Sequence, residues 1–179
     1  MTKRLVLLLA MAALLGFAVP SQGNAQATLY ISGGAAIPIG DFGEFSKTGW
    51  MAAGGVLFDA GPSGLGIGAE VFYGQNNHEA DVFNSKTTPY GAMAIVDYAF
   101  GTAGGIRPYV FGGLGLLVHR ISGDGFDSES DSQFGYQFGG GVSFPIGGTT
   151  SLYGEGRYMG SESTKYFGVL AGLAFGLGN

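Results

Sequence analysis

The sequence predicts an all-β protein: an eight-stranded antiparallel up-and-down transmembrane β-barrel, preceded by a cleavable signal peptide. Apolar and polar residues alternate with a period of two in eight segments, and segments of about ten residues are long enough to cross a bilayer as tilted strands. Only 12% of the 179 residues are charged, whereas a soluble domain averages about 25%. We therefore expect much of the surface to face something other than water.

The first 27 residues have the features of a secretory signal peptide. Lys3 and Arg4 precede an apolar run at 5–19, and a small-residue cleavage site, Ala-Gln-Ala, ends at Ala27. The apolar run is shorter than the roughly 20 residues that a membrane-spanning helix needs. We expect a signal peptide at 1–27 and one outer-membrane β-barrel domain at 28–179. Cysteine is absent, so no disulfide is expected.

The clearest strand is the segment 106–120, which reads IRPYVFGGLGLLVHR. Its even positions are mostly aliphatic from Val110 to Val118, whereas its odd positions include Arg107, Tyr109 and two glycines. Successive side chains of a strand point to opposite faces, so one face of this segment is aliphatic and the other is mixed. The segment also exceeds the 9 to 11 residues or so that a tilted strand needs to cross a bilayer.

Seven further segments alternate in the same way, and turn-forming residues separate them. They span 28–39, 48–58, 64–74, 87–100, 133–146, 150–159 and 165–177. The apolar parity is odd in 28–39, 64–74 and 165–177, and it is even in 87–100, 133–146 and 150–159. Only 48–58 is ambiguous, because it has large apolar residues at both parities. An even number of alternating strands is typical of a transmembrane barrel.

The connections between these segments alternate in length. The connections at 59–63, 101–105 and 147–149 are short, those at 40–47, 75–86 and 121–132 are longer and polar, and the last one at 160–164 is brief. Outer-membrane barrels have short periplasmic turns and longer outer loops. With both chain ends in the periplasm, the longer connections therefore become outer loops.

Charged residues within the predicted strands identify the face that lines the lumen. Five of these residues, Glu70, Asp97, Arg107, Glu155 and Arg157, lie on the non-aliphatic parity. An Arg or Lys that faces lipid at mid-depth costs about 2 to 4 kcal/mol, so we expect the five residues to point inward and form an ion-pair network.

Side chains are expected to fill the interior of this barrel, because eight strands leave no wider space. Glycine columns at 113 and 115, at 139 and 141, and at 64 and 66 lie on the inward parity. They would make room for inward Tyr30, Tyr109 and Tyr153, together with the two arginines. The sequence therefore predicts a plugged lumen without a continuous channel.

Nine of the 13 acidic residues fall in the predicted outer loops: Asp41, Glu44, Glu79, Asp81, Asp124, Asp127, Glu129, Asp131 and Glu162. Four of them, Asp124, Asp127, Glu129 and Asp131, gather in one loop, and hard divalent cations favour carboxylate ligands. The spacing does not match an EF-hand, so a solvated acidic loop is the favoured interpretation and a weak divalent-cation site is the alternative. No dedicated metal site and no cofactor are predicted, and the net charge of −5 disfavours nucleic acid as a partner.

Several motifs resemble those of a known family across the whole predicted domain. The runs at 107–110 (RPYV) and 112–115 (GGLG) resemble the Pro-Tyr-Val and Gly-x-Gly strand of small outer-membrane β-barrel domains. The runs at 137–142 (QFGGGV) and 155–158 (EGRY) are similar to that family's sixth and seventh strands. The family includes the OmpA transmembrane domain, OmpX and opacity-like porin proteins.

The resemblance implies a protein of the cell outer membrane, where variable surface loops serve a structural, adhesive or envelope-integrity role. It implies outer-membrane lipid and lipopolysaccharide as surroundings, the barrel assembly machinery as a partner in biogenesis, and a surface partner at the outer loops. No enzymatic activity and no catalytic residues are expected.

Two alternatives stay open at this point. A lipid A-modifying enzyme would use His119 with the nearby Ser122 and Asp124, since a hydrolase needs a nucleophile beside a base. A soluble exported carrier of the lipocalin type would share the strand count, but its aliphatic face would line a cavity and its charges would face water.

Overall fold

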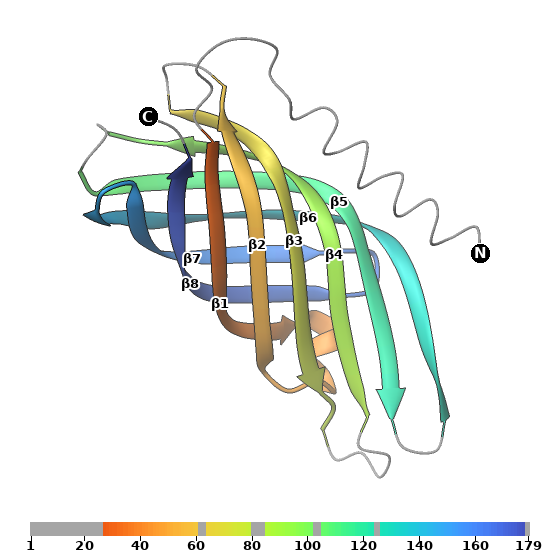
Figure 1. Cartoon of the computed structure of the whole chain (residues 1–179). Coiled ribbons are helices and arrows are strands. Elements are labelled where there is room, and N and C mark those ends of the chain that lie inside the picture. The colour runs from red at the N-terminus through yellow and green to blue at the C-terminus, as the bar shows by residue number, and fades with distance from the viewer. Residues whose placement is uncertain (1–26, 61–63, 80–84, 102–104, 124–125, 178–179) are drawn as a thin grey trace.

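The computed structural model describes residues 27–60, 64–79, 85–101, 105–123 and 126–177, and of residues 126 and 127 only the backbone. Its elements are β1 (Ala27–Ile39), the 3-10 helix η1 (Gly40–Glu44), β2 (Gly49–Asp59), β3 (Leu65–Asn77), β4 (Lys86–Ala99), β5 (Arg107–Gly123), β6 (Phe126–Gly147), β7 (Thr150–Gly160) and β8 (Lys165–Leu177). Figure 1 shows these strands as one tilted, curved sheet. Apart from Ala27, the predicted signal peptide lies outside the described residues.

The eight strands form a closed antiparallel barrel in which each strand pairs with its neighbours in the sequence. β8 pairs back to β1, with Leu177 opposite Ala27 and Lys165 opposite Ile39. Closure leaves no unpaired sheet edge through the wall of the barrel. The predicted fold class, an eight-stranded up-and-down barrel, is confirmed. No helix in the described ranges is long and apolar enough to span a membrane.

One predicted outer loop is instead mostly strand. Residues 121–132 were expected to form a long loop, but β5 continues to Gly123 and β6 begins at Phe126. Ile121 pairs with Glu129 in the resulting hairpin. Side chains at 128–132 are exposed on both faces of this hairpin, so its residues have no reason to alternate between apolar and polar, and the sequence has no apolar–polar period of two there.

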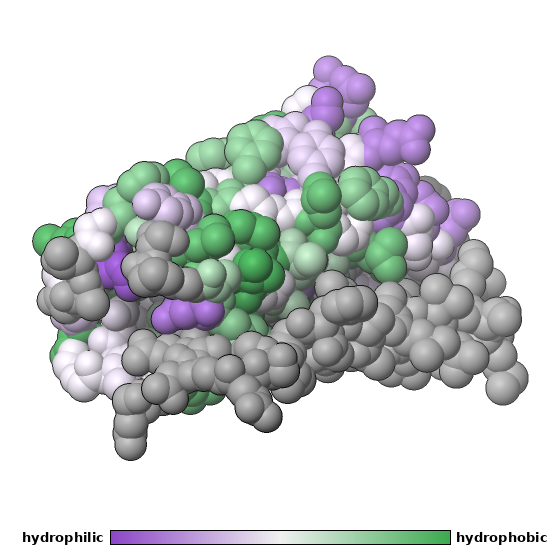
Figure 2. All heavy atoms as spheres, turned by 90° about the horizontal axis from the view of Figure 1, so that it is seen from above, coloured by the Kyte–Doolittle hydropathy of each residue, from purple (hydrophilic) through white to green (hydrophobic). Residues whose placement is uncertain are grey.

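The outward faces of the strands are apolar. The large hydrophobic residues that are exposed include Ile31, Ile67, Val71, Val96, Val110, Leu114, Phe138, Phe167 and Val169. Figure 2 shows hydrophobic residues across the middle of one side of the molecule and hydrophilic residues gathered at one end. This orientation is the reverse of the one that a lipocalin-like soluble carrier requires.

Aromatic rings mark both ends of the apolar band. On one end Tyr73 lies between Trp50 and Tyr90, with ring centroids 5.7 and 6.5 Å apart. On the other end Tyr98 packs edge-on against Phe100 at 4.9 Å. Tyr90 and Phe100 are ten residues apart on one chain segment, which corresponds to about 25 Å for a strand tilted by about 40°. That is the height of the apolar band of an outer-membrane barrel.

The first outer connection folds over the end of the lumen that is remote from the chain termini. Phe42 of η1 is buried and packs edge-on against Tyr166 of β8, with the ring centroids 5.2 Å apart. The buried amide of Asn76 donates hydrogen bonds to the carbonyl oxygens of Ala36 and Lys47, at 3.0 and 2.9 Å. This connection, expected to be a polar outer loop, therefore supplies an apolar cap to the barrel interior.

Candidate functional site

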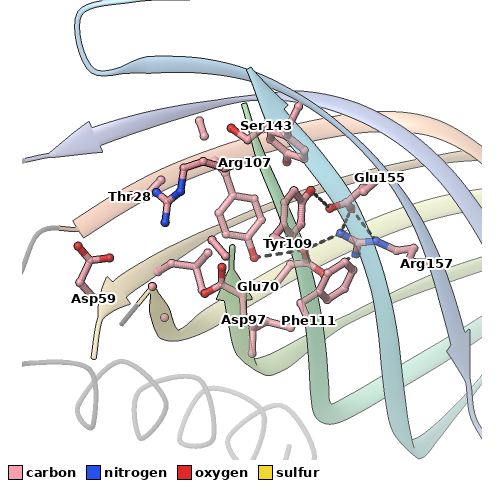
Figure 3. Close-up of a pocket in the computed structure, with 18 residues that line it drawn as sticks. Thr28, Asp59, Glu70, Asp97, Arg107, Tyr109, Phe111, Ser143, Glu155 and Arg157 are labelled. Carbon is pink, nitrogen blue, oxygen red and sulfur yellow. Dashed lines mark hydrogen bonds and ion pairs between the residues drawn. The ribbon is translucent and has the colours of Figure 1, made fainter. Parts of the chain in front are cut away.

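A buried ion-pair network lies inside the barrel and is centred on Arg157 of β7, which is only 2% exposed. Its guanidinium contacts Glu70 of β3 through two nitrogens, with Nη1 2.6 Å from Oε1 and Nη2 3.0 Å from Oε2. The same guanidinium contacts Glu155, with Nε 2.9 Å from Oε1 and Nη2 also bonded to that oxygen. One cation is therefore shared between two carboxylates of opposite barrel walls (Figure 3).

Neutral donors complete the network. The Tyr30 hydroxyl donates to Glu70 at 3.2 Å, and the Tyr109 hydroxyl donates to Glu155 at 2.8 Å. The Gln137 amide donates to Glu70 at 2.9 Å and accepts from Arg157 at 3.2 Å. Each buried charge thus has several hydrogen-bond partners, which is the condition under which a buried ion pair is tolerated.

Glycines on neighbouring strands make room for the tyrosines. A Cβ atom at Gly141 would lie 2.6 Å from the Tyr109 hydroxyl oxygen, and one at Gly55 would lie 2.6 Å from that of Tyr30. The inward position of Gly141 follows from the predicted glycine column at 139 and 141. Because the large ring and the missing side chain lie on different strands, their pairing depends on the strand register.

The lumen is apolar between the network and the end of the barrel that is remote from the chain termini. Phe72 follows Glu70 on the inward face of β3, and Met159 follows Arg157 on β7. The buried apolar side chains of the interior include Met51, Phe72, Met93, Ile95, Leu117, Met159 and Leu170. This layer is not among the predicted features, although the apolar residues at both parities of 48–58 are a signal for it.

A cavity of about 160 Å³ lies between the network and the end of the barrel at which the chain termini lie. Its lining includes Asp97 and Arg107, the two remaining residues of the predicted network. Among the described residues, the only ion pairs are those that Arg157 makes with Glu70 and Glu155. The structure therefore brings three of the five predicted residues together and leaves Asp97 and Arg107 as cavity-lining charges. Figure 3 shows Arg107 set apart from Arg157.

His119 lies in the lumen near its outer end, where it contacts hydroxyl groups. Its Nε2 atom is 3.3 Å from the Ser161 Oγ and also bonds the Thr164 Oγ1. Ser122 does not approach this ring, because it lines a groove on the outside of the barrel, and Asp124 lies outside the described residues. The His119–Ser122 pair on which the lipid A enzyme hypothesis depended is therefore not formed.

The four residues of the predicted acidic loop do not lie together in one loop of the structure, because β6 begins within it. Asp127, Glu129 and Asp131 belong to β6, and Asp124 falls outside the described residues. Glu129 and Asp131 are exposed, and Asp131 accepts a hydrogen bond from Gln133 at 2.7 Å. In the part of the chain that is described, no three potential metal ligands gather to hold an ion. The weak divalent-cation site stays a prediction.

Known structures share this architecture. A major outer membrane protein from Thermus thermophilus superposes with a TM-score of 0.69 at 12% identity, covering 87% of this chain and 100% of that one. Neisserial surface protein A superposes at 0.58 with 19% identity, covering 87% and 99%. Ail, the attachment invasion locus protein of Yersinia pestis, superposes at 0.58 with 15% identity, covering 87% and 100%.

Sequence similarity extends to a family but to no single curated protein. Residues 9–176 match the model of the outer membrane protein beta-barrel domain. The matched range includes every described strand except the final residue of β8. Together with the lipid-facing apolar band and the buried charges, this match places the protein in the cell outer membrane. The chain belongs to the outer membrane protein beta-barrel domain family.

Proposed function

We propose that this protein is a non-conducting outer-membrane barrel that acts by contact at the cell surface, as a structural or adhesive protein of the envelope. The filled lumen supports this proposal. Arg157 and its partners cross the interior, and buried Met93, Leu117 and Met159 follow them on the outer side. A lumen filled in this way by the described side chains favours a function at the outer surface of the barrel over solute transport.

The proposal predicts that the purified barrel forms no stable ion-conducting steps in planar lipid bilayers. A general porin reconstituted in the same way serves as the positive control. Heat-dependent gel migration shows that the inserted protein is folded, so that an absence of conductance steps cannot be attributed to unfolded chains. Regular conductance steps from the folded wild-type protein would contradict a closed lumen.

The outer surface has a projecting element, the hairpin of β5 and β6. β7 pairs with β6 only from Tyr136 onward, so β6 residues 126–135 pair with β5 alone. Phe134 on this free segment is 65% exposed. The hairpin therefore offers both an unpaired strand edge and an apolar side chain for contact, which is a recurring arrangement for strand-mediated recognition.

The charge of this surface points to the kind of partner. The exposed acidic side chains in the described outer connections and hairpin are Asp41, Glu44, Glu79, Glu129, Asp131 and Glu162. Ail has been solved with the heparin analogue sucrose octasulfate, a polyanion. An acidic hairpin disfavours such a ligand and favours a partner with basic groups, because complementary charges steer association.

We expect a shortened hairpin to abolish surface contact while leaving the barrel intact. In this variant an Asn-Gly turn replaces residues 121–129 and joins Arg120 to Ser130, which face each other in the wild type. Non-adherent cells displaying the wild type should bind a polylysine-coated surface, and the shortened variant should not. A full-length Glu129→Gln/Asp131→Asn control should bind weakly and lose sensitivity to salt. Equal binding by all three proteins would contradict the role of the hairpin.

A further inference from the structure

A polar groove lies on the outside of the barrel wall, separate from the lumen. It has a volume of about 430 Å³ and is lined by Tyr73 of β3, by Lys86, Thr88 and Tyr90 of β4, and by Arg120 and Ser122 of β5. On β4 these residues share the even parity of Ala92, Ala94 and Val96, whose side chains face outward. The groove therefore opens toward the membrane and its surroundings.

The aromatic rings at the end of the apolar band indicate the depth of the groove in the membrane. Tyr73 and Tyr90 form its lower edge, and Tyr and Trp side chains collect where the acyl chains meet the headgroups. Tyr90 pairs with Val118, and Lys86 and Arg120 lie beyond this pair, away from the chain termini. Because both termini of such barrels are periplasmic, the two cations lie at the headgroup level of the outer leaflet.

The structure shows no acidic partner for either cation within the ranges that it describes. Among the residues that the structure describes, no carboxylate lies within ion-pair distance of Lys86 or Arg120. The Arg120 guanidinium donates one hydrogen bond, to the Ser128 Oγ at 2.9 Å. Four more of its five N–H groups are free to bind a ligand in this arrangement. On a chain of net charge −5, two neighbouring cations without an acidic partner among the described residues mark a site for an anion.

The register places these groups around one point. Lys86 faces Ser122, and Arg120 faces Thr88, so the two cations lie on a diagonal across neighbouring strands. Diagonal neighbours in an antiparallel pair are about 7 to 8 Å apart, which long side chains span easily. A tetrahedral oxyanion between them can receive two parallel N–H bonds from Arg120 and one from the Lys86 ammonium. The hydroxyls of Thr88 and Ser122 are further donors at the same level.

We propose that this groove binds the phosphate of an outer-leaflet glycolipid, of the lipid A type. The phosphate contacts Lys86 and Arg120, while the acyl chains descend past Tyr90 along the aliphatic face of β4. A membrane lipid is the occupant that fits, because the groove is continuous with the apolar band below it and opens sideways toward the bilayer. A soluble phosphate would use only the upper half of such a site.

The test uses the full-length folded barrel in a neutral detergent, with diphosphoryl lipid A as the probe and native mass spectrometry as the readout. The wild type should retain lipid A, and the Lys86→Gln/Arg120→Gln variant should bind it about tenfold or more weakly, since two charge-assisted contacts are removed. The matched control is Lys47→Gln/Lys165→Gln, which removes two exposed cations of the outer end that do not line the groove. This control should bind as the wild type does.

Three results would overturn the proposal. One is undiminished retention of lipid A by the Lys86→Gln/Arg120→Gln variant, once heat-dependent gel migration has shown it to be folded. Another is equal retention of dephosphorylated lipid A by the wild type, which would mean that the phosphate is not recognised. The third is displacement of lipid A by millimolar inorganic phosphate, which would identify the groove as a site for soluble anions.

Discussion

Replacing Arg157 with methionine is expected to lower the free energy of unfolding by about 3 to 5 kcal/mol, the usual cost of removing one partner from a buried ion pair. The guanidinium is 2% exposed and is the cation that both Glu70 and Glu155 contact. Without it, two carboxylates would lie in the interior with only neutral donors. Urea titration of the barrel in lipid vesicles, followed by heat-dependent gel migration, measures the loss.

Two further variants separate this effect from a general loss of packing. Arg107→Met removes an arginine that lines the cavity but makes no ion pair among the described residues, and should cost less than about 1 kcal/mol. In a Glu70→Gln/Glu155→Gln background, Arg157→Met should cost much less than in the wild type, because no buried carboxylate is left unpaired. An equal loss in both backgrounds would show that the network contributes through volume and not through charge.

A single methyl group added inside the barrel wall is expected to have the second largest effect. Gly68 of β3 faces inward, and a Cβ atom there would overlap the backbone of Val56 and lie 2.9 Å from the Leu57 Cα. Backbone atoms of a paired strand cannot move aside without breaking the ladder, so we expect Gly68→Ala to cost about 1 to 3 kcal/mol. The same urea titration measures this cost.

Gly112 of β5 is the matched control. It faces outward, and the nearest atom to an added Cβ is the Gln137 carbonyl oxygen at 3.8 Å. Gly112→Ala should be neutral or should stabilise the protein by about 0.5 to 1 kcal/mol, because glycine weakens a strand. If Gly68→Ala proved as stable as Gly112→Ala, close strand packing would not explain why glycines line the interior.

Much of the candidate site was predictable because side-chain direction in a strand depends only on parity. The charges of Glu70, Glu155 and Arg157 and the ring of Tyr109 all lie opposite the aliphatic parity, and the structure places all four in the lumen. A charged side chain that faces lipid costs free energy, so residue type and the period of two together predict whether it points to the lumen or to the lipid. The outer groove at Lys86 and Arg120 was not predicted, because it depends on which strands lie side by side at the headgroup level.

The sequence alone determined that this protein is an eight-stranded barrel with its aliphatic face outward, because a period of two and the cost of charge in lipid act locally on each strand. Only the tertiary structure decided which charges pair, since Glu70 and Arg157 lie 87 residues apart and meet across the lumen. It also decided that 121–132 extends the wall as a hairpin and that an apolar layer follows the ion pairs. Register and closure set these features, and both depend on all eight strands at once.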